Sequence, residues 1–207
     1  MSVDSKPKIL LVDDHPLIRL GLRRSLEAAD LICCGEAATR AEAYAQIAHH
    51  APDGVILDLN LPDGSGLDIV QWIRKNSKTM AIVILTMSNE ERDLIAAMRA
   101  GASSFVQKSA PLVEVITALK SSLALPQNFS AAGLVQVLKN IDAIEQLSPR
   151  ELTVLSTLTQ TGSNQQLAKL LHISEATFKT HLAAIYRKFK VNSRLEAIKI
   201  AKSINLL

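Results

Sequence analysis

The sequence predicts two domains: an α/β domain built on a parallel sheet, followed by a small all-α domain. Two observations support this division. Up to residue 125, short aliphatic runs alternate with helix-length segments, which is the pattern of strands joined by crossover helices. From residue 147 onward no strand pattern appears, and helix-start signals follow one another. We place the first domain at 1–125, a linker containing a helix at 126–146, and the helical domain at 147–207.

Five strands are expected in the first domain, because five runs of aliphatic and β-branched residues are apolar almost throughout. Between them, Thr39 with Glu42 has the spacing of a capping box, and Pro111 suits a first helical turn. A second capping box is expected at Ser88 and Glu91. Strands this apolar need helices on both faces of the sheet. The five runs cover 8–12, 31–35, 54–59, 81–86 and 104–107.

The residues after 125 change in character. Pro126 interrupts the alternation, and 131–146 has the spacing of an amphipathic helix, which we assign to the linker. In the last domain, helices are expected to begin after Ser148, Ser174 and Ser193. Ser148 and Ser193 are each followed by a glutamate at capping-box spacing, so the last domain is interpreted as a small helical bundle.

Composition and charge limit the possible functions. No apolar run approaches the ~18 residues of a membrane span, and the start lacks a charged and then apolar leader, so we expect a cytoplasmic protein without a membrane partner. Residues 1–125 carry 13 basic and 15 acidic side chains, a net −2, whereas 126–207 carry 10 and 5, a net +5. A basic last domain suggests a polyanionic partner. The two cysteines, Cys33 and Cys34, are interpreted as buried small hydrophobic residues.

Polar side chains stand at the carboxyl ends of four predicted strands, where ligands bind in an open parallel sheet. Any one of them could be an ordinary cap or turn residue, but five at matched strand ends argue for a site. Three crowded carboxylates repel one another unless a hard cation such as Mg²⁺ neutralises them. A carboxylate can also accept a phosphoryl group, whose oxygens a lysine and a threonine would bind. The five residues are Asp13, Asp14, Asp58, Thr86 and Lys108.

The motifs around these residues resemble the receiver domain of two-component response regulators over about residues 7–125. The resemblance implies a flavodoxin-like, doubly wound sheet of five parallel strands. It implies that Asp58 is the phosphoacceptor for a sensor histidine kinase and a ligand of Mg²⁺. The other ligands would be Asp14 directly, Asp13 mainly through water, and the backbone carbonyl of Asn60. The motifs are VDDHP at 12–16, DLNLP at 58–62, Thr86, and GASSFVQK at 101–108.

The resemblance also implies a switch pair. The Thr86 hydroxyl would be drawn toward the phosphoryl group held by Lys108, and the ring of Phe105 would turn inward. Periodicity alone reads Phe105 as a core aromatic residue of a strand. Met87 departs from the family pattern, which usually has a small residue at this position. We therefore expect small phosphodonors to load Asp58 slowly and the acyl phosphate to hydrolyse slowly.

The segment 164–190 has the form helix, turn, helix. In the second helix one stripe is apolar and is expected to be buried: Phe178, Leu182, Ile185 and Phe189. The opposite side carries Lys179, Thr180, Ala183 and Arg187. A polar and basic helix face presented by a turn is the geometry of a recognition helix in the major groove, with a solvated surface helix as the alternative. Phosphate contacts are expected from Lys188, Lys190, Arg194, Lys199 and Lys202.

Residues 145–207 resemble the LuxR-type helix-turn-helix, and the two halves together match the NarL/FixJ class of response regulators. The motifs are LSPRE at 147–151, ISEATFKTH at 173–181 and IYRKF at 185–189. The resemblance implies that Lys179 and Thr180 reach bases or nearby phosphates. Ala183 stands where the family often has a polar residue, so we expect sparse base readout and a larger share for DNA deformability. A metal finger is excluded, because no cysteine or histidine pair has ligand spacing.

The function expected is that of a DNA-binding transcription regulator switched by Mg²⁺-dependent phosphorylation of Asp58, not that of an enzyme. Its partners would be a sensor histidine kinase and double-stranded DNA, with a homodimer as the phosphorylated form. Two alternatives stay open. One is a regulator of the same architecture that ignores phosphorylation. The other is an aspartyl-phosphate phosphatase of the haloacid dehalogenase type, which needs an acid where Asn60 stands.

Overall fold

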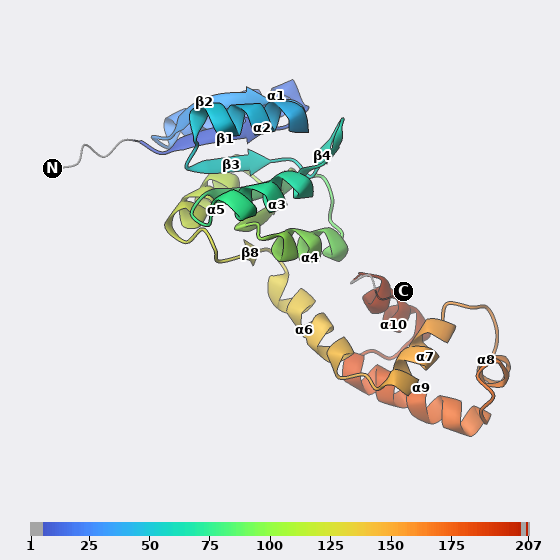
Figure 1. Ribbon diagram of the computed structural model, residues 1–207. Coiled ribbons are helices and arrows are strands. Elements are labelled where there is room, and N and C mark those ends of the chain that lie inside the picture. Colours follow the sequence, from blue (N-terminus) through green and yellow to red (C-terminus); the bar gives the residue numbers. More distant parts are fainter. Residues whose placement is uncertain (1–5, 204–205, 207) are drawn as a thin grey trace. The chain divides into compact units, whose positions relative to one another are not determined.

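The structure is a computed structural model that describes residues 6–203 and 206. The extreme ends of the two predicted domains, 1–5, 204–205 and 207, lie outside the described residues. The chain divides into two compact units, and the main boundary lies between Ala132 and Gly133. Figure 1 follows the chain through the first unit in blue and green and the second in yellow to red. The two units are described separately below.

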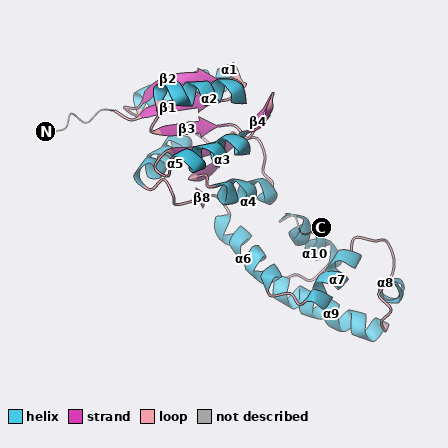
Figure 2. Ribbon diagram, viewed as in Figure 1, coloured by secondary structure: helices cyan, strands magenta, loops and turns pink. Residues whose placement is uncertain are grey.

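The first unit is built on one parallel sheet with the strand order β2-β1-β3-β6-β7-β8 (Figure 2). The predicted parallel α/β fold is confirmed, but the predicted number of strands is too low by one. The additional strand, β8, has two residues and is too short to show a period in the sequence. The strands are β1 Lys8–Val12, β2 Ile32–Ala37, β3 Gly54–Leu57, β6 Ala81–Thr86, β7 Ser104–Gln107 and β8 Ser130–Ala131.

Chain connections around β3 also differ from the prediction. β3 ends at Leu57, so Asp58 lies just past the strand, and an antiparallel hairpin follows, formed by β4 (Asn60–Leu61) and β5 (Gly64–Ser65). Strand order reverses between β1 and β3, because β2 pairs with one side of β1 and β3 with the other. A ligand site is expected at such a switch point.

Helices cover both faces of this sheet. On one face α1 and α5 pack on each other and share a core in which Leu22, Leu26 and Leu119 meet Ile9 and Leu11 of β1. On the other face α2 contacts α3 and lies over β1 and β2. The helices are α1 Pro16–Ala28, α2 Arg40–His50, α3 Gly66–Asn76, α4 Glu91–Ala100 and α5 Leu112–Ala124.

The predicted caps of two of these helices differ from the structure in detail. Thr39 caps α2 by accepting from the Glu42 amide, but the Glu42 carboxylate accepts from the Ala38 amide instead of closing the box on Thr39. The capping box expected at Ser88 and Glu91 is wrong, because α4 begins only at Glu91. The Ser88 hydroxyl contacts the carboxylate of Asp93. A loop between β6 and the helix therefore takes the place of the expected first turn.

The second unit is helical, as predicted. Ser148 and Glu151 form a complete capping box, and Ser174 and Ser193 accept from amides in the first turns of α9 and α10. The linker helix α6 begins at Leu134, three residues later than expected, because residues 130–131 belong to β8. No helix within the described part of the chain has the length and apolar character to span a bilayer. The helices are α6 Leu134–Glu145, α7 Pro149–Thr157, α8 Asn164–Leu170, α9 Glu175–Phe189 and α10 Arg194–Ser203.

Candidate functional site

The strand register brings the predicted site residues of the first unit to one edge of the sheet. Val12 of β1 lies opposite Leu57 of β3, and the ladder continues past the strands, since the Asp58 amide donates to the Val12 carbonyl at 2.8 Å. Asp13 therefore emerges beside Asp58. On the next pair of strands the Lys108 amide donates to the Thr86 carbonyl at 2.7 Å. Four separate segments thus deliver their polar side chains to the carboxyl edge.

Lys108 is the centre of this edge. Its Nζ lies 2.7 Å from an oxygen of Asp13 and 2.7 Å from an oxygen of Asp58. The three side chains are only 2%, 3% and 4% exposed. Burial lowers the pKa of Lys108, but hydrogen bonds and charge attraction from Asp13 and Asp58 outweigh it, so the pKa is raised overall. One ammonium group is therefore held against two buried carboxylates.

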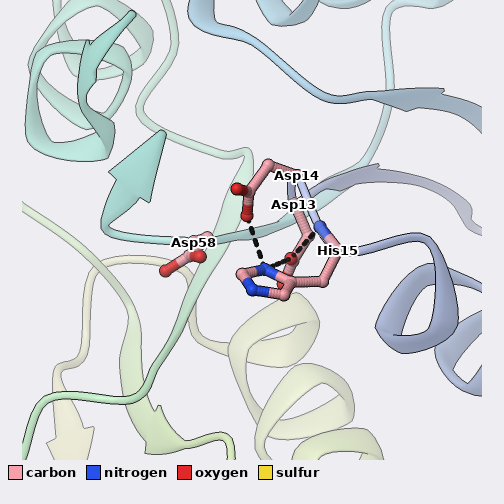
Figure 3. Close-up of side chains that lie close together, drawn as sticks. All are labelled: Asp13, Asp14, His15 and Asp58. Atoms are coloured by element: carbon pink, nitrogen blue, oxygen red, sulfur yellow. Dashed lines mark hydrogen bonds and ion pairs between the residues drawn. The ribbon is translucent and has the colours of Figure 1, made fainter. Parts of the chain in front are cut away.

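Negative charge exceeds positive charge around this lysine. Asp13, Asp14, His15 and Asp58 each offer a ligand atom, and these atoms all lie within 4.8 Å of one another (Figure 3). The His15 ring contacts the carboxylates of Asp13 and Asp14. Asp13 Oδ2 and Asp14 Oδ1 are buried, the first against Lys108 and the second against the His15 ring. Clustered carboxylate oxygens are the donor set that a hard cation such as Mg²⁺ prefers.

The loop after Asp58 is held tightly against that residue. The Asn60 amide donates to Asp58 Oδ1 at 3.2 Å, and the hairpin then returns the chain so that the Gly66 amide donates to the Leu59 carbonyl at 2.7 Å. A Cβ at Gly66 would lie 2.2 Å from the Asp58 carbonyl oxygen. Gly66 was not anticipated as a site residue, because nothing in the local sequence reports how closely two loop backbones approach.

The proposed switch residues lie beside this cluster. Thr86 is fully buried and its hydroxyl accepts from the Ser88 amide at 3.1 Å. Phe105 is buried in β7, opposite Ile84 of β6. Met87, by contrast, is 74% exposed. The structure thus gives a buried hydroxyl and a buried ring on adjacent strands, next to an exposed thioether.

Arg19 supports the acidic loop and was also missed by the sequence analysis. Its guanidinium donates to the Asp13 carbonyl and to Glu36 on β2, with Nε 2.9 Å from the Glu36 carboxylate. The partners are 6 and 17 residues away, so no local pattern reveals the contact. Arg19 ties α1 to the loop that carries Asp13 and Asp14.

The second unit presents the predicted recognition helix. The apolar stripe of α9 is buried as expected, at Phe178, Leu182, Ile185 and Phe189. Lys179, Thr180, Ala183 and Arg187 are exposed. Lys179 pairs with Glu175 one turn earlier at 2.7 Å, but both side chains are largely solvated, so the pair is weak and leaves the lysine available. α9 therefore has a mixed polar and basic face in water.

Of the five basic residues expected to contact phosphates, Lys188 and Arg194 have partners inside the unit, while Lys190, Lys199 and Lys202 are exposed. Lys188 Nζ lies 2.9 and 2.7 Å from the two carboxylate oxygens of buried Glu151 and donates to the Gln146 carbonyl. Burial raises the pKa of Glu151, but bonds from Lys188 and Ser148 prevail and lower it to about 2. Arg194 donates to the carbonyls of Leu158, Gln160 and Gly162, at and beyond the end of α7. Lys190 stays exposed and ends α9 with φ 56°.

Comparisons with known proteins assign both units. Residues 9–120 match the family model described as response regulator receiver domain, and residues 145–201 match bacterial regulatory proteins of the luxR family. The nitrate/nitrite response regulator protein NarL of Escherichia coli K12 is 31% identical over 206 residues, 95% of each chain. The response regulator protein VraR of Staphylococcus aureus Mu3 is 29% identical over 205 residues, 97% of this chain and 98% of that protein. The fold is shared with a structure of RcsB from Salmonella enterica serovar Typhimurium, which is bound to promoter rprA in the presence of the phosphomimetic BeF3−. The TM-score is 0.63 at 23% identity, and the match covers 97% of this chain and 100% of that chain.

Proposed function

The chain belongs to the response regulators that join a receiver domain to a LuxR-type DNA-binding domain, and on this premise we propose that phosphorylation of Asp58 controls its binding to DNA. The observation that supports this proposal most directly is the uncompensated negative charge beside Lys108. Buried carboxylates without matching cations are costly to a fold, so their presence argues for ligands that complete the site. The family consists of transcription regulators, which counts against the phosphatase alternative.

Mg²⁺ fits the acidic cluster, in which three carboxylates surround one lysine. Asp14 and Asp58 would bind it directly, Asp13 mainly through water, and the Asn60 carbonyl would add a further oxygen. When bound, the ion supplies positive charge that offsets the carboxylates and the oxygens of an incoming phosphoryl group. His15 and Arg19 hold the acidic loop in place, His15 through the carboxylates and Arg19 through the Asp13 carbonyl.

Phosphoryl transfer then needs little beyond positioning by this chain. One carboxylate oxygen of Asp58 attacks phosphorus, the bond from phosphorus to the donor histidine nitrogen breaks, and the imidazole keeps the electron pair and takes up a proton. Lys108 exchanges its contact with Asp58 for the phosphoryl oxygens, and the buried Thr86 hydroxyl donates to them. The phosphoryl group adds about −1.5 to −2 charges at this edge, which biases β6 and β7 toward a second arrangement around Phe105.

The DNA contact is proposed for the exposed face of α9. Lys179, Thr180 and Arg187 would lie in or along the major groove, with Lys190 on a phosphate and Ala183 leaving little base readout at its position. Lys188 and Arg194 are better explained as structural residues, because Lys188 is paired with Glu151 and the guanidinium of Arg194 donates to backbone carbonyls of the unit. RcsB is described as forming dimers on DNA, and we extend this to the present chain as a homodimer on a two-fold related site.

The test measures operator affinity and molecular mass with and without beryllofluoride, a phosphoryl mimic, in the full chain. Wild type is expected to gain affinity and mass, whereas Asp58→Asn stays in the basal state. Asp30→Asn is the matched control, because Asp30 is exposed and its φ of 65° suits asparagine. Equal behaviour of all three proteins with and without the mimic would favour a regulator that ignores phosphorylation.

A further inference from the structure

The segment after α5, assigned from the sequence to the linker, is bound to the sheet of the first unit. β8 extends the sheet beyond β7, with Ser130 opposite Ser104 and Ala131 opposite Phe105. The Ser130 amide donates to the Ser103 carbonyl at 3.1 Å. In Figure 1, β8 lies at this edge of the sheet and α6 follows it along the chain. The chain therefore leaves the first unit as a strand of its sheet.

Two buried serines hold this segment in place. Ser104 Oγ lies 3.0 Å from the Ser130 carbonyl oxygen, to which it donates, and 3.2 Å from the Ser130 hydroxyl. Ser103 Oγ donates to the Pro126 carbonyl at 2.6 Å, and the guanidinium of Arg74 donates to the same carbonyl at 3.1 Å. Buried hydroxyl groups are costly unless they are bonded, and the partners of the Ser104 hydroxyl are both on Ser130, so its burial in β7 favours the docked segment.

The strand that carries this segment is also the strand next to the phosphorylation site. On its other side, β7 pairs Phe105 with Ile84 and Gln107 with Thr86, the residue that ends β6. Lys108, which contacts Asp58, directly follows β7. A change in the position of Phe105 or Lys108 therefore acts on the same backbone ladder that holds Ala131.

We propose that the segment 126–131 carries the state of the phosphorylation site from β7 to the linker helix α6. This inference rests on the function proposed above and specifies its route. A two-residue edge strand is the kind of element that opens by local unfolding while the rest of the domain stays folded. Gly133, with φ 77°, separates β8 from α6, whose first turn begins with Val137 donating to the Gly133 carbonyl. When β8 is docked, the chain is fixed to the sheet up to Ala131, just before α6. When β8 is released, α6 is joined to the sheet by a longer free segment.

The experiment compares Ser130→Pro with Ser130→Thr in the full chain. Proline removes the amide that donates to Ser103 and weakens the edge strand, while threonine keeps both the amide and the hydroxyl and suits a strand. Ser130 is exposed, so neither change disturbs the core. Operator affinity is measured with and without beryllofluoride, and loading of Asp58 is followed separately by the ¹⁹F NMR signal of the bound mimic.

The expected readout is the ratio of the operator affinity with beryllofluoride to the operator affinity without it. In wild type and Ser130→Thr this ratio should lie in the range of about 5- to 150-fold that coupled sites show. In Ser130→Pro it should fall toward one, although the mimic still loads. A ratio that is unchanged in Ser130→Pro overturns the inference and leaves the proposed function intact. A wild-type ratio of one overturns both the inference and the proposed function. Loss of mimic loading in Ser130→Pro also contradicts the inference, because it shows that β8 supports the phosphorylation site itself rather than the effect of that site on DNA binding.

Discussion

Both units hold a lysine against buried carboxylates, and the difference between the two arrangements separates the candidate functional site from a structural contact. In the helical unit one lysine, Lys188, meets one carboxylate, Glu151, and both of its oxygens are bonded. In the receiver, Lys108 meets two carboxylates at 2.7 Å with Asp14 close by, so three carboxylates gather around one lysine. Burial and ion pairing alone therefore do not identify a site.

The imbalance of charge is what distinguishes the receiver cluster. A matched pair has no net charge left to attract a further ion. An unmatched cluster still lacks positive charge after folding, so a bound cation can offset the repulsion between its carboxylates, and a phosphoryl group, which adds negative charge, can then move the residues around it. The predictions below test this contrast, beginning with the largest expected effect.

Removing each lysine should distinguish the two clusters. Lys188→Met leaves Glu151 buried without its partner, and the helical unit should lose about 3 kcal/mol of stability whether or not Mg²⁺ is present. Lys108→Met should destabilise the receiver by a similar amount without divalent ions, but millimolar Mg²⁺ should restore much of it. Chemical denaturation followed by NMR of amides in each unit measures both effects.

Lys199→Met is the control for the general loss of a lysine, since Lys199 is exposed on α10. A Mg²⁺ effect of equal size in the Lys108 and Lys188 variants would contradict the contrast.

Acid should weaken the helical unit in a defined range. The pKa of Glu151 is lowered to about 2 from an ordinary value of 4.5, because the bonds from Lys188 and Ser148 outweigh burial. A carboxylate with a depressed folded pKa stabilises the fold above its unfolded pKa, and this stabilisation is lost as pH falls from 4.5 toward 2. The loss should reach about 2–3 kcal/mol and can be measured by amide exchange in α7 and α9. Glu151→Gln should be less stable at neutral pH and should flatten the dependence.

Gly66→Ala should disturb the phosphorylation site through the backbone. The added Cβ would lie 2.2 Å from the Asp58 carbonyl oxygen, so the loop must shift, at about 1–3 kcal/mol of receiver stability. The rate of Asp58 phosphorylation by a small phosphodonor should fall at the same time. Gly21→Ala is the matched control, because the nearest atom to its Cβ would be Leu112 Cδ1 at 3.6 Å. Equal phosphorylation rates in the two variants would show that the approach of Gly66 does not position Asp58.

The DNA-binding face should be visible in the salt dependence of operator affinity. Lys179→Ala and Arg187→Ala should each reduce the slope of log affinity against log salt by about 0.9, the value for one lost phosphate contact. Lys120→Ala in α5, an exposed lysine of the receiver, should leave the slope unchanged. If the α9 variants keep the wild-type slope, the exposed face of this helix is not the contact surface.

Met87 should have the smallest effect. Its side chain is 74% exposed and adjoins Thr86, so Met87→Ala should open the approach to Asp58. Loading by a small phosphodonor and hydrolysis of the acyl phosphate should both rise on the order of threefold, which corresponds to less than about 1 kcal/mol in each barrier. Unchanged rates of both reactions would dismiss a role for Met87 in access.

The candidate site was predictable to the extent that it depends on strand ends. Asp13, Asp58, Thr86 and Lys108 follow apolar runs, and parallel pairing brings the ends of such runs to one edge whatever the details of packing. The buried stripe of α9 was predictable for a similar reason, because a period of 3.6 places Phe178 and Phe189 on one side of a helix. Both features follow from short-range repetition in the chain.

The sequence by itself therefore determined the two units, the acidic edge and which side of α9 is buried. Only the tertiary structure decided which cations have partners: Lys188 and Arg194 look like free surface cations in the sequence, but Lys188 pairs with Glu151 and Arg194 donates to backbone carbonyls inside the helical unit. It also decided the approach of Gly66 to Asp58 and the docking of β8 on β7. These features join segments far apart in the chain, and their free energies depend on distance and burial, which no local pattern of residues contains.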